Sequence, residues 1–214
     1  MTTTKEWPDA VIKQITDSIA YNAPTRTLST LLPFDSIKFG KDCIELHNSI
    51  IKTLYKDEKM KLGDRIVGAS TATHTILKNQ GLAGDLKIIS FLTAEGKNAT
   101  GNATANKLKE SVGDYVKKYY SGSGVSIFGV SALDGYHSML LTYRLTSDKK
   151  SEFMLIDQGP ATSLISGKVI FSTSQALDDA LSEYVRGRKD KRTGGNYEYP
   201  ANISLYKIYP KASK

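Results

Sequence analysis

Residues 134–158 of the chain read DGYHSMLLTYRLTSDKKSEFMLIDQ. Two runs rich in apolar and aromatic residues, 136–145 and 152–157, are separated by the short polar segment Thr146-Ser-Asp-Lys-Lys150. This pattern is typical of a β-hairpin. A pairing centred near Ser147 places His137 opposite Asp157, and a slip of one or two residues still leaves both at the same end. The sequence therefore predicts a hairpin that carries a histidine and a carboxylate together.

Strand patterns continue around this hairpin, and helical patterns dominate the first half of the chain. Further strands are expected at Val125–Val130, Lys168–Phe171 and Ile203–Tyr209, with one helix among them at Ser174–Arg186. The first half has helical spacing from Trp7 to about Tyr21, from Cys43 onward, from Arg65 to Lys78 and from Ala105 to Tyr119, with one strand candidate at Leu86–Leu92. Segregated helices and strands predict an α+β fold, in which a helical N-terminal half packs on a mostly antiparallel sheet.

Length and composition favour one packed domain. The chain has 214 residues, 40% of them hydrophobic and 24% charged, which is ordinary for a globular protein. We expect a single domain over 1–214. Within it, 1–40 would form an N-terminal helix and a packed loop, 41–120 a helical part with the Cys43 helix, and 121–214 a mainly antiparallel sheet with one helix.

The net charge of +7 indicates attraction to anionic partners. Its densest cluster, Arg186-Gly-Arg-Lys-Asp-Lys-Arg192, precedes Thr-Gly-Gly-Asn and has no interleaved aromatic residues. This composition is typical of a solvated loop, so a nucleic-acid partner is not expected.

The chain shows neither a secretory signal nor a membrane span. No apolar stretch follows the first charges of the N-terminus. No run reaches the ~18 apolar residues that a bilayer span requires. We expect a soluble protein; a signal that has been removed, or export by a specialised route that needs none, would leave the same sequence.

Cys43 is the single cysteine, so it cannot form an intramolecular disulfide. The segment Asp42-Cys-Ile-Glu45 matches a capping box, with Asp42 as N-cap and Glu45 at N3, which sets Cys43 at the first helical position. A helix N-terminus favours the thiolate form of a cysteine, whereas the two neighbouring carboxylates oppose it. A nucleophilic role therefore requires a cationic partner; a lone cysteine is also often a small buried hydrophobe.

The chain has three histidines, of which His137 is the best partner for that thiol. His47 lies one helical turn after Cys43, where its ring projects alongside the thiol rather than in front of it, so a packed role is expected. His74 has nothing nearby to orient it and is interpreted as a structural or surface residue. His137 has Asp157, which would hold the distal ring nitrogen and favour the useful tautomer, and Gln158 would replace or assist that carboxylate.

A helix-initiating cysteine, a strand-borne histidine and a carboxylate one strand later follow in an order that resembles the papain-like superfamily. In particular, it resembles that of compact bacterial cell-wall amidases and endopeptidases of the NlpC/P60 kind and of interbacterial amidase toxins. The resemblance rests on Asp42-Cys43, Gly135-Tyr-His137 and Ile156-Asp157-Gln158, and covers roughly 40–157. The resemblance implies a cysteine peptidase or amidase, with peptidoglycan peptide as the first choice of substrate and a host or rival protein next. For a toxin it also implies an immunity protein that blocks the cleft.

The sequence departs from that family next to the cysteine. Ile44-Glu45 replaces the usual aromatic residue or glycine, and no clear upstream glutamine is present for an oxyanion hole. The backbone N–H of Cys43 supplies one donor for that hole, and Lys41 or Tyr136 are the candidates for the second.

Two other interpretations stay open at this point. Cys43 and His47 could face one metal ion, with His74 or His137 as a further ligand, but no pair has a recognised zinc spacing, so no metal or cofactor is expected. The non-enzymatic alternative is a basic binding module for a protein partner, which would use the loops Lys97–Thr104 and Arg188–Tyr199. That alternative predicts an unreactive thiol.

Overall fold

The structure, a computed structural model, describes residues 6–18, 43–63, 69–99, 105–132, 135, 137–157, 167–185 and 200–212. In chain order the elements of these ranges are α1 (Ala10–Ser18), α2 (Cys43–Tyr55), α3 (Ala69–Asn79), β1 (Lys87–Leu92), β2 (Lys107–Leu108), α4 (Val112–Lys118), β3 (Ser126–Ala132), β4 (His137–Leu145), β5 (Ser151–Asp157), β6 (Gly167–Phe171), α5 (Ser174–Val185) and β7 (Asn202–Ile208). The predicted α+β class and the antiparallel sheet are confirmed. None of the helices in these ranges is long and apolar enough to cross a lipid bilayer.

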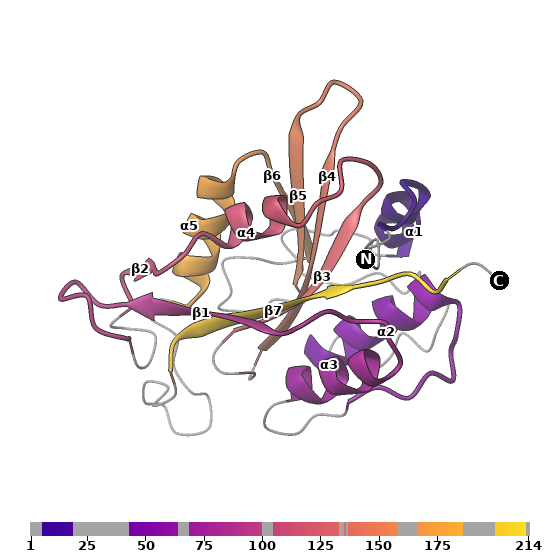
Figure 1. Ribbon diagram of the computed structural model, residues 1–214, viewed down its shortest axis with the longest axis horizontal. Helices are drawn as coiled ribbons and strands as arrows, with labels where there is room; N and C mark the ends of the chain where they lie inside the picture. The colour runs from indigo at the N-terminus through magenta and orange to yellow at the C-terminus, as the bar shows by residue number, and fades with distance from the viewer. Residues whose placement is uncertain are drawn as a thin grey trace.

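The strands form one seven-stranded sheet in the order β2-β1-β7-β3-β4-β5-β6, and each of these described pairs is antiparallel. The sheet is strongly twisted, since β1 and β7 run nearly crosswise to β4 and β5 (Figure 1). All seven residues of β3 are buried, as are the first seven of β4. These strands therefore form the centre of the molecule.

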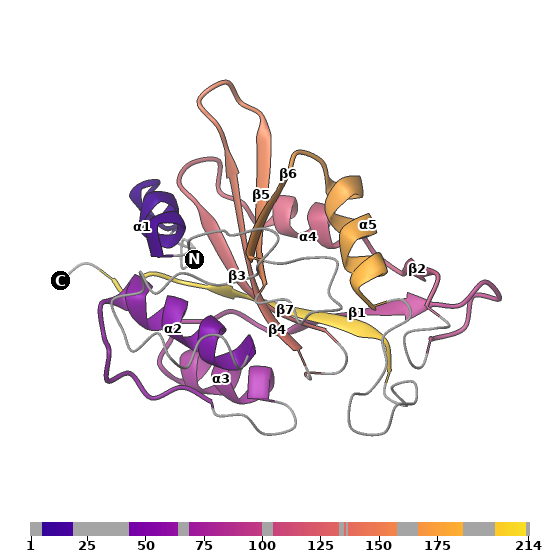
Figure 2. The same cartoon turned by 180° about the vertical axis from the view of Figure 1, so that it is seen from behind.

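Helices cover both faces of the sheet. Side chains that alternate along the strands divide between two cores, because successive residues of a strand point to opposite faces. One core joins α1, α2 and α3 to residues such as Ile127 and Leu140, whereas the other joins α4 and α5 to Phe128 and Leu141. Figures 1 and 2 show these two groups of helices on opposite sides of the central strands.

The β4–β5 hairpin has nearly the predicted register. Leu140 faces Ile156 and Leu145 faces Ser151, so the pairing is centred one residue later than expected. The next residue of β5, Asp157, therefore lies opposite Met139 rather than His137. Because side chains alternate with a period of two, this displacement keeps His137 and Asp157 on the same face and at the same end of the hairpin.

The predicted helix over Ala105–Tyr119 is wrong in its first part. Lys107–Leu108 is instead a short edge strand that pairs with Phe91 and Leu92 of β1. α4 begins only after Ser111, whose side chain accepts a hydrogen bond from the Asp114 N–H at 3.0 Å as its N-cap. Pairing with an open sheet edge thus outweighs the helical spacing of the first apolar residues.

Candidate active site

Cys43 is the first residue of α2, as predicted, and its side chain is partly exposed. This position places it at the positive end of the helix macrodipole. Asp42, the predicted N-cap, lies outside the described residues. The Oε2 atom of Glu45 is buried and has no hydrogen-bond partner, so this oxygen takes no part in a capping box.

His137 and Asp157 meet at one end of the sheet, as the first residue of β4 and the last residue of β5. His137 Nε2 lies 2.5 Å from Asp157 Oδ1. His137 is 7% exposed and Asp157 is fully buried. A buried carboxylate at this distance fixes the orientation of the ring and favours its charged form.

The side chain of Cys43 lies close enough to His137 to favour its protonated imidazole, both as a hydrogen-bonding group and through its charge. Since Nε2 is directed at Asp157, Nδ1 is the ring nitrogen left for the thiol. Burial by itself lowers the pKa of His137, but the charge of Asp157, its hydrogen bond and the contact with Cys43 outweigh burial and raise the pKa to about 10. The imidazole is therefore protonated at neutral pH, beside a sulfur atom at a helix start.

Tyr184, near the end of α5, stacks on the His137 ring. The ring centroids are 4.8 Å apart and the planes are inclined by 23°. Tyr184 is 2% exposed. No local sequence pattern predicts this contact, because Tyr184 belongs to an ordinary apolar stripe of its helix and nothing local links that stripe to His137.

The other two histidines are held in packed positions, as expected. His47 Nδ1 lies 2.9 Å from the Met139 carbonyl oxygen and Nε2 lies 3.3 Å from the Tyr206 hydroxyl. Burial, which outweighs the Met139 hydrogen bond, and the charge of His137 lower the pKa of His47 to about 4. His74 Nε2 lies 2.7 Å from the Gly84 carbonyl oxygen.

These contacts weaken the metal alternative. Both ring nitrogens of His47 are engaged by protein groups, so neither is directed at an ion shared with Cys43. Among the residues that the structure describes, no group of three or more histidine, cysteine or carboxylate side chains has a geometry suited to a metal ion.

Several predicted features lie outside the described residues. They are Gln158, the possible oxyanion donors Lys41 and Tyr136, the basic cluster 186–192 and the loop 188–199. The loop at Lys97–Thr104 is described only as far as Ala99.

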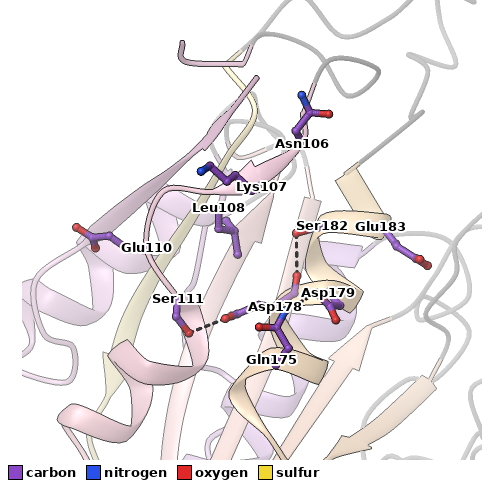
Figure 3. A pocket seen from close by; sticks show the side chains of 10 residues that line it. All are labelled: Asn106, Lys107, Leu108, Glu110, Ser111, Gln175, Asp178, Asp179, Ser182 and Glu183. Carbon is purple, nitrogen blue, oxygen red and sulfur yellow. Dashed lines mark hydrogen bonds between the residues drawn. The ribbon is translucent and has the colours of Figure 1, made fainter. Parts of the chain in front are cut away.

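A separate polar pocket of about 410 Å³ lies between β2 and α5 (Figure 3). None of its lining residues belongs to the Cys43 arrangement. Asp178, one of the residues that line it, accepts hydrogen bonds from Ser111 Oγ at 2.5 Å and from the Gly113 N–H at 3.1 Å. Burial raises the pKa of Asp178 despite these bonds, which join α5 to the start of α4.

No protein-family model, curated protein or solved structure matches this chain. A function for this chain is therefore inferred from the geometry of Cys43, His137 and Asp157.

Proposed function

We propose that the chain is a cysteine-dependent amide hydrolase of the papain-like kind, with Cys43 as nucleophile, His137 as acid and base, and Asp157 as the residue that orients His137. The observation that carries this proposal is one arrangement, in which His137 lies 2.5 Å from Asp157 and Cys43 lies close enough to His137 to favour its charged form. It joins three buried or partly buried side chains from three elements. A structural cysteine needs no such partner, whereas a nucleophilic one does.

The proposed reaction begins from a thiolate and an imidazolium. The Cys43 sulfur attacks the amide carbonyl carbon, so that a C–S bond forms and the carbonyl oxygen becomes an oxyanion. His137 gives its proton to the departing nitrogen as the C–N bond breaks, which leaves a thioester. His137 then takes a proton from water, the resulting hydroxide releases the acid, and the Cys43–His137 pair is restored.

The start of α2 supports the oxyanion in this scheme. The first N–H groups of a helix have no acceptor within the helix, so the N–H of Cys43 is available to a developing negative charge. The helix macrodipole acts in the same direction. Lys41 and Tyr136 stay our candidates for the second donor.

For the substrate we propose peptide amides, with peptidoglycan peptides first, and a secreted or delivered bacterial effector as the biological setting. The net charge of +7 supports an anionic cell-wall polymer. The papain-like resemblance supports the amide bond. In this setting an immunity or inhibitor protein would cover the partly exposed thiol.

The test is cleavage of purified peptidoglycan and of a mixed peptide library, followed by mass spectrometry. We expect the wild-type protein to release new amine and carboxylate ends, and Cys43→Ala to release none while keeping its circular dichroism spectrum and melting temperature. Equal cleavage by both proteins would assign the activity to another site or a contaminant. An unreactive Cys43 would instead favour the basic binding module.

A further inference from the structure

His137 is contacted by helices from both layers of the molecule. Cys43 comes from α2, which packs on the sheet face with α1 and α3, whereas Tyr184 comes from α5 on the opposite face. Nε2 of His137 lies 2.5 Å from Asp157 Oδ1, which leaves Nδ1 as the ring nitrogen for Cys43. Tyr184 covers one face of the same ring.

The stack restricts a motion that Asp157 leaves open. A single contact from Nε2 to Oδ1 fixes one edge of the imidazole, but the ring can still swing about that contact. A nearly parallel aromatic ring at 4.8 Å defines the plane of the imidazole, so that the second nitrogen stays directed at the thiol. Tyr184 is itself 2% exposed, and it therefore also keeps water from that face.

The stack also favours one charge state. The face of a tyrosine ring carries negative electrostatic potential and attracts a cation placed over it. His137 is cationic in the resting pair, because Asp157 and Cys43 both favour its protonated form. A leucine would keep the site apolar but provide neither the plane nor the potential of an aromatic ring.

We propose that Tyr184 is a positioning residue of the reactive pair: its ring fixes the plane of the His137 imidazolium and stabilises the positive charge that Cys43 requires. This inference deepens the proposed function and depends on it. Tyr184 lies beyond the part of the chain that carries the papain-like resemblance.

The test compares Tyr184→Leu with Tyr184→Phe in the full chain, and uses the pH dependence of Cys43 alkylation by iodoacetamide. Cys43 is the single cysteine, so the modified mass reports on this thiol alone. In Tyr184→Leu, the pH dependence of alkylation should shift to higher pH by about 0.5–1 pH unit, and alkylation at pH 6 should be about three- to tenfold slower. Tyr184→Phe keeps the ring and should stay within about twofold of wild type.

Tyr143→Leu is the matched control, because Tyr143 is a buried tyrosine of the same core whose ring packs against Tyr120 and Phe153. It should lower the melting temperature without moving the profile. A Tyr184→Leu profile that coincides with wild type would overturn the inference. If Tyr184→Leu does not fold, pentafluorophenylalanine at position 184 keeps the ring but reverses its potential, and a profile equal to that of Tyr184→Phe would overturn the inference equally.

The reactivity of wild-type Cys43 distinguishes failure of this inference from failure of the proposed function. If wild-type Cys43 reacts slowly below pH 7, with or without the Tyr184 ring, both are overturned. If wild-type Cys43 reacts quickly and only the Tyr184 variants leave the profile unchanged, the hydrolase proposal stands and the role of Tyr184 is rejected.

Discussion

His47 and His137 lie on elements that pack together and are both nearly excluded from solvent, at 2% and 7% exposure, yet their pKa values move in opposite directions. Burial lowers the pKa of His47 to about 4, since its partners are an uncharged carbonyl and an uncharged hydroxyl. His137 has a carboxylate and a thiol instead, and its pKa rises to about 10. Burial thus disfavours the charged imidazole at both sites. Whether the histidine is protonated nevertheless depends on the groups that contact its ring.

The charge at one of these sites also affects the other. The charge of His137 lowers the pKa of His47 further. One imidazole of the pair is therefore cationic and directed at Cys43, while its neighbour is a neutral packing residue. The following predictions test this division, from the largest expected effect to the smallest.

Replacing the cationic histidine should abolish the chemistry. His137→Gln keeps a hydrogen-bond donor for Asp157 but removes the acid and base, so amide cleavage should fall about 10²–10⁴-fold. His47→Gln should stay within about threefold of wild type, because that ring takes no part in proton transfer. The measurement is the rate of product release under saturating substrate. A similar loss in both variants would contradict the division between the two histidines.

Asp157→Asn should lower the pKa of His137 while leaving its imidazole in place. The amide cannot balance the imidazolium charge, so the pKa of His137 should fall from about 10 toward or below its ordinary value. Activity should decrease about 10²-fold or more, in proportion to the lost cation and tautomer control. NMR titration of the His137 ring measures the first effect. An unchanged titration would show that Asp157 does not set the charge.

Stability at alkaline pH should depend on His137. Its pKa is raised from 6.5 to about 10 in the folded protein, so its contribution is fully present below pH 6.5 and is lost as pH rises toward 10. Urea unfolding from pH 6.5 to 10 should show this decline. In His137→Gln the decline should be shallower, and an equally steep decline there would assign it to other groups.

Stability at acid pH should depend on His47, and here the protein should lose stability as pH falls rather than as it rises. Its pKa is lowered from 6.5 to about 4, so the unfolded chain binds the proton first, and stability falls as pH drops from 6.5 to 4. In His47→Gln, the decrease in stability between pH 6.5 and pH 4 should be smaller. Other carboxylates titrate below pH 5, so the decisive comparison is wild type against His47→Gln between pH 5 and 6.5. Parallel curves over that interval would contradict a buried neutral His47.

The smallest effect is expected at the hydroxyl that contacts His47. Tyr206→Phe removes a 3.3 Å partner of the buried Nε2 and should lower the free energy of unfolding by about 1 kcal/mol. Alkylation of Cys43 should not change, since the hydroxyl that is removed contacts His47 and not the proposed acid and base. A changed alkylation rate would mean that the two histidines are coupled more strongly than their contacts indicate.

Much of this site could be predicted from local sequence patterns. A capping signal placed Cys43 at a helix start, and two strand patterns around a polar turn placed His137 and Asp157 at one end of a hairpin. The hairpin register was off by one residue in its centre, because turn geometry fixes register and the polar turn did not specify it. This displacement keeps both side chains on the same face of the sheet, so His137 and Asp157 are still in contact.

Long-range contacts could not be predicted in this way. Helical spacing concealed β2, which forms only because β1 offers an open edge. Tyr184 looked like any other apolar position of α5, and its stack on His137 depends on how that helix packs against the end of the sheet. Pattern and spacing describe single elements, whereas these contacts depend on how elements meet.

The most direct test of the central claim is the rate of Cys43 alkylation by iodoacetamide as a function of pH in wild type, His137→Gln and His47→Gln. The account predicts rapid alkylation below pH 7 in wild type and in His47→Gln, and loss of that low-pH reactivity in His137→Gln. Slow alkylation of wild type below pH 7, with a rate that rises like that of an ordinary thiol and is indifferent to His137, would contradict it.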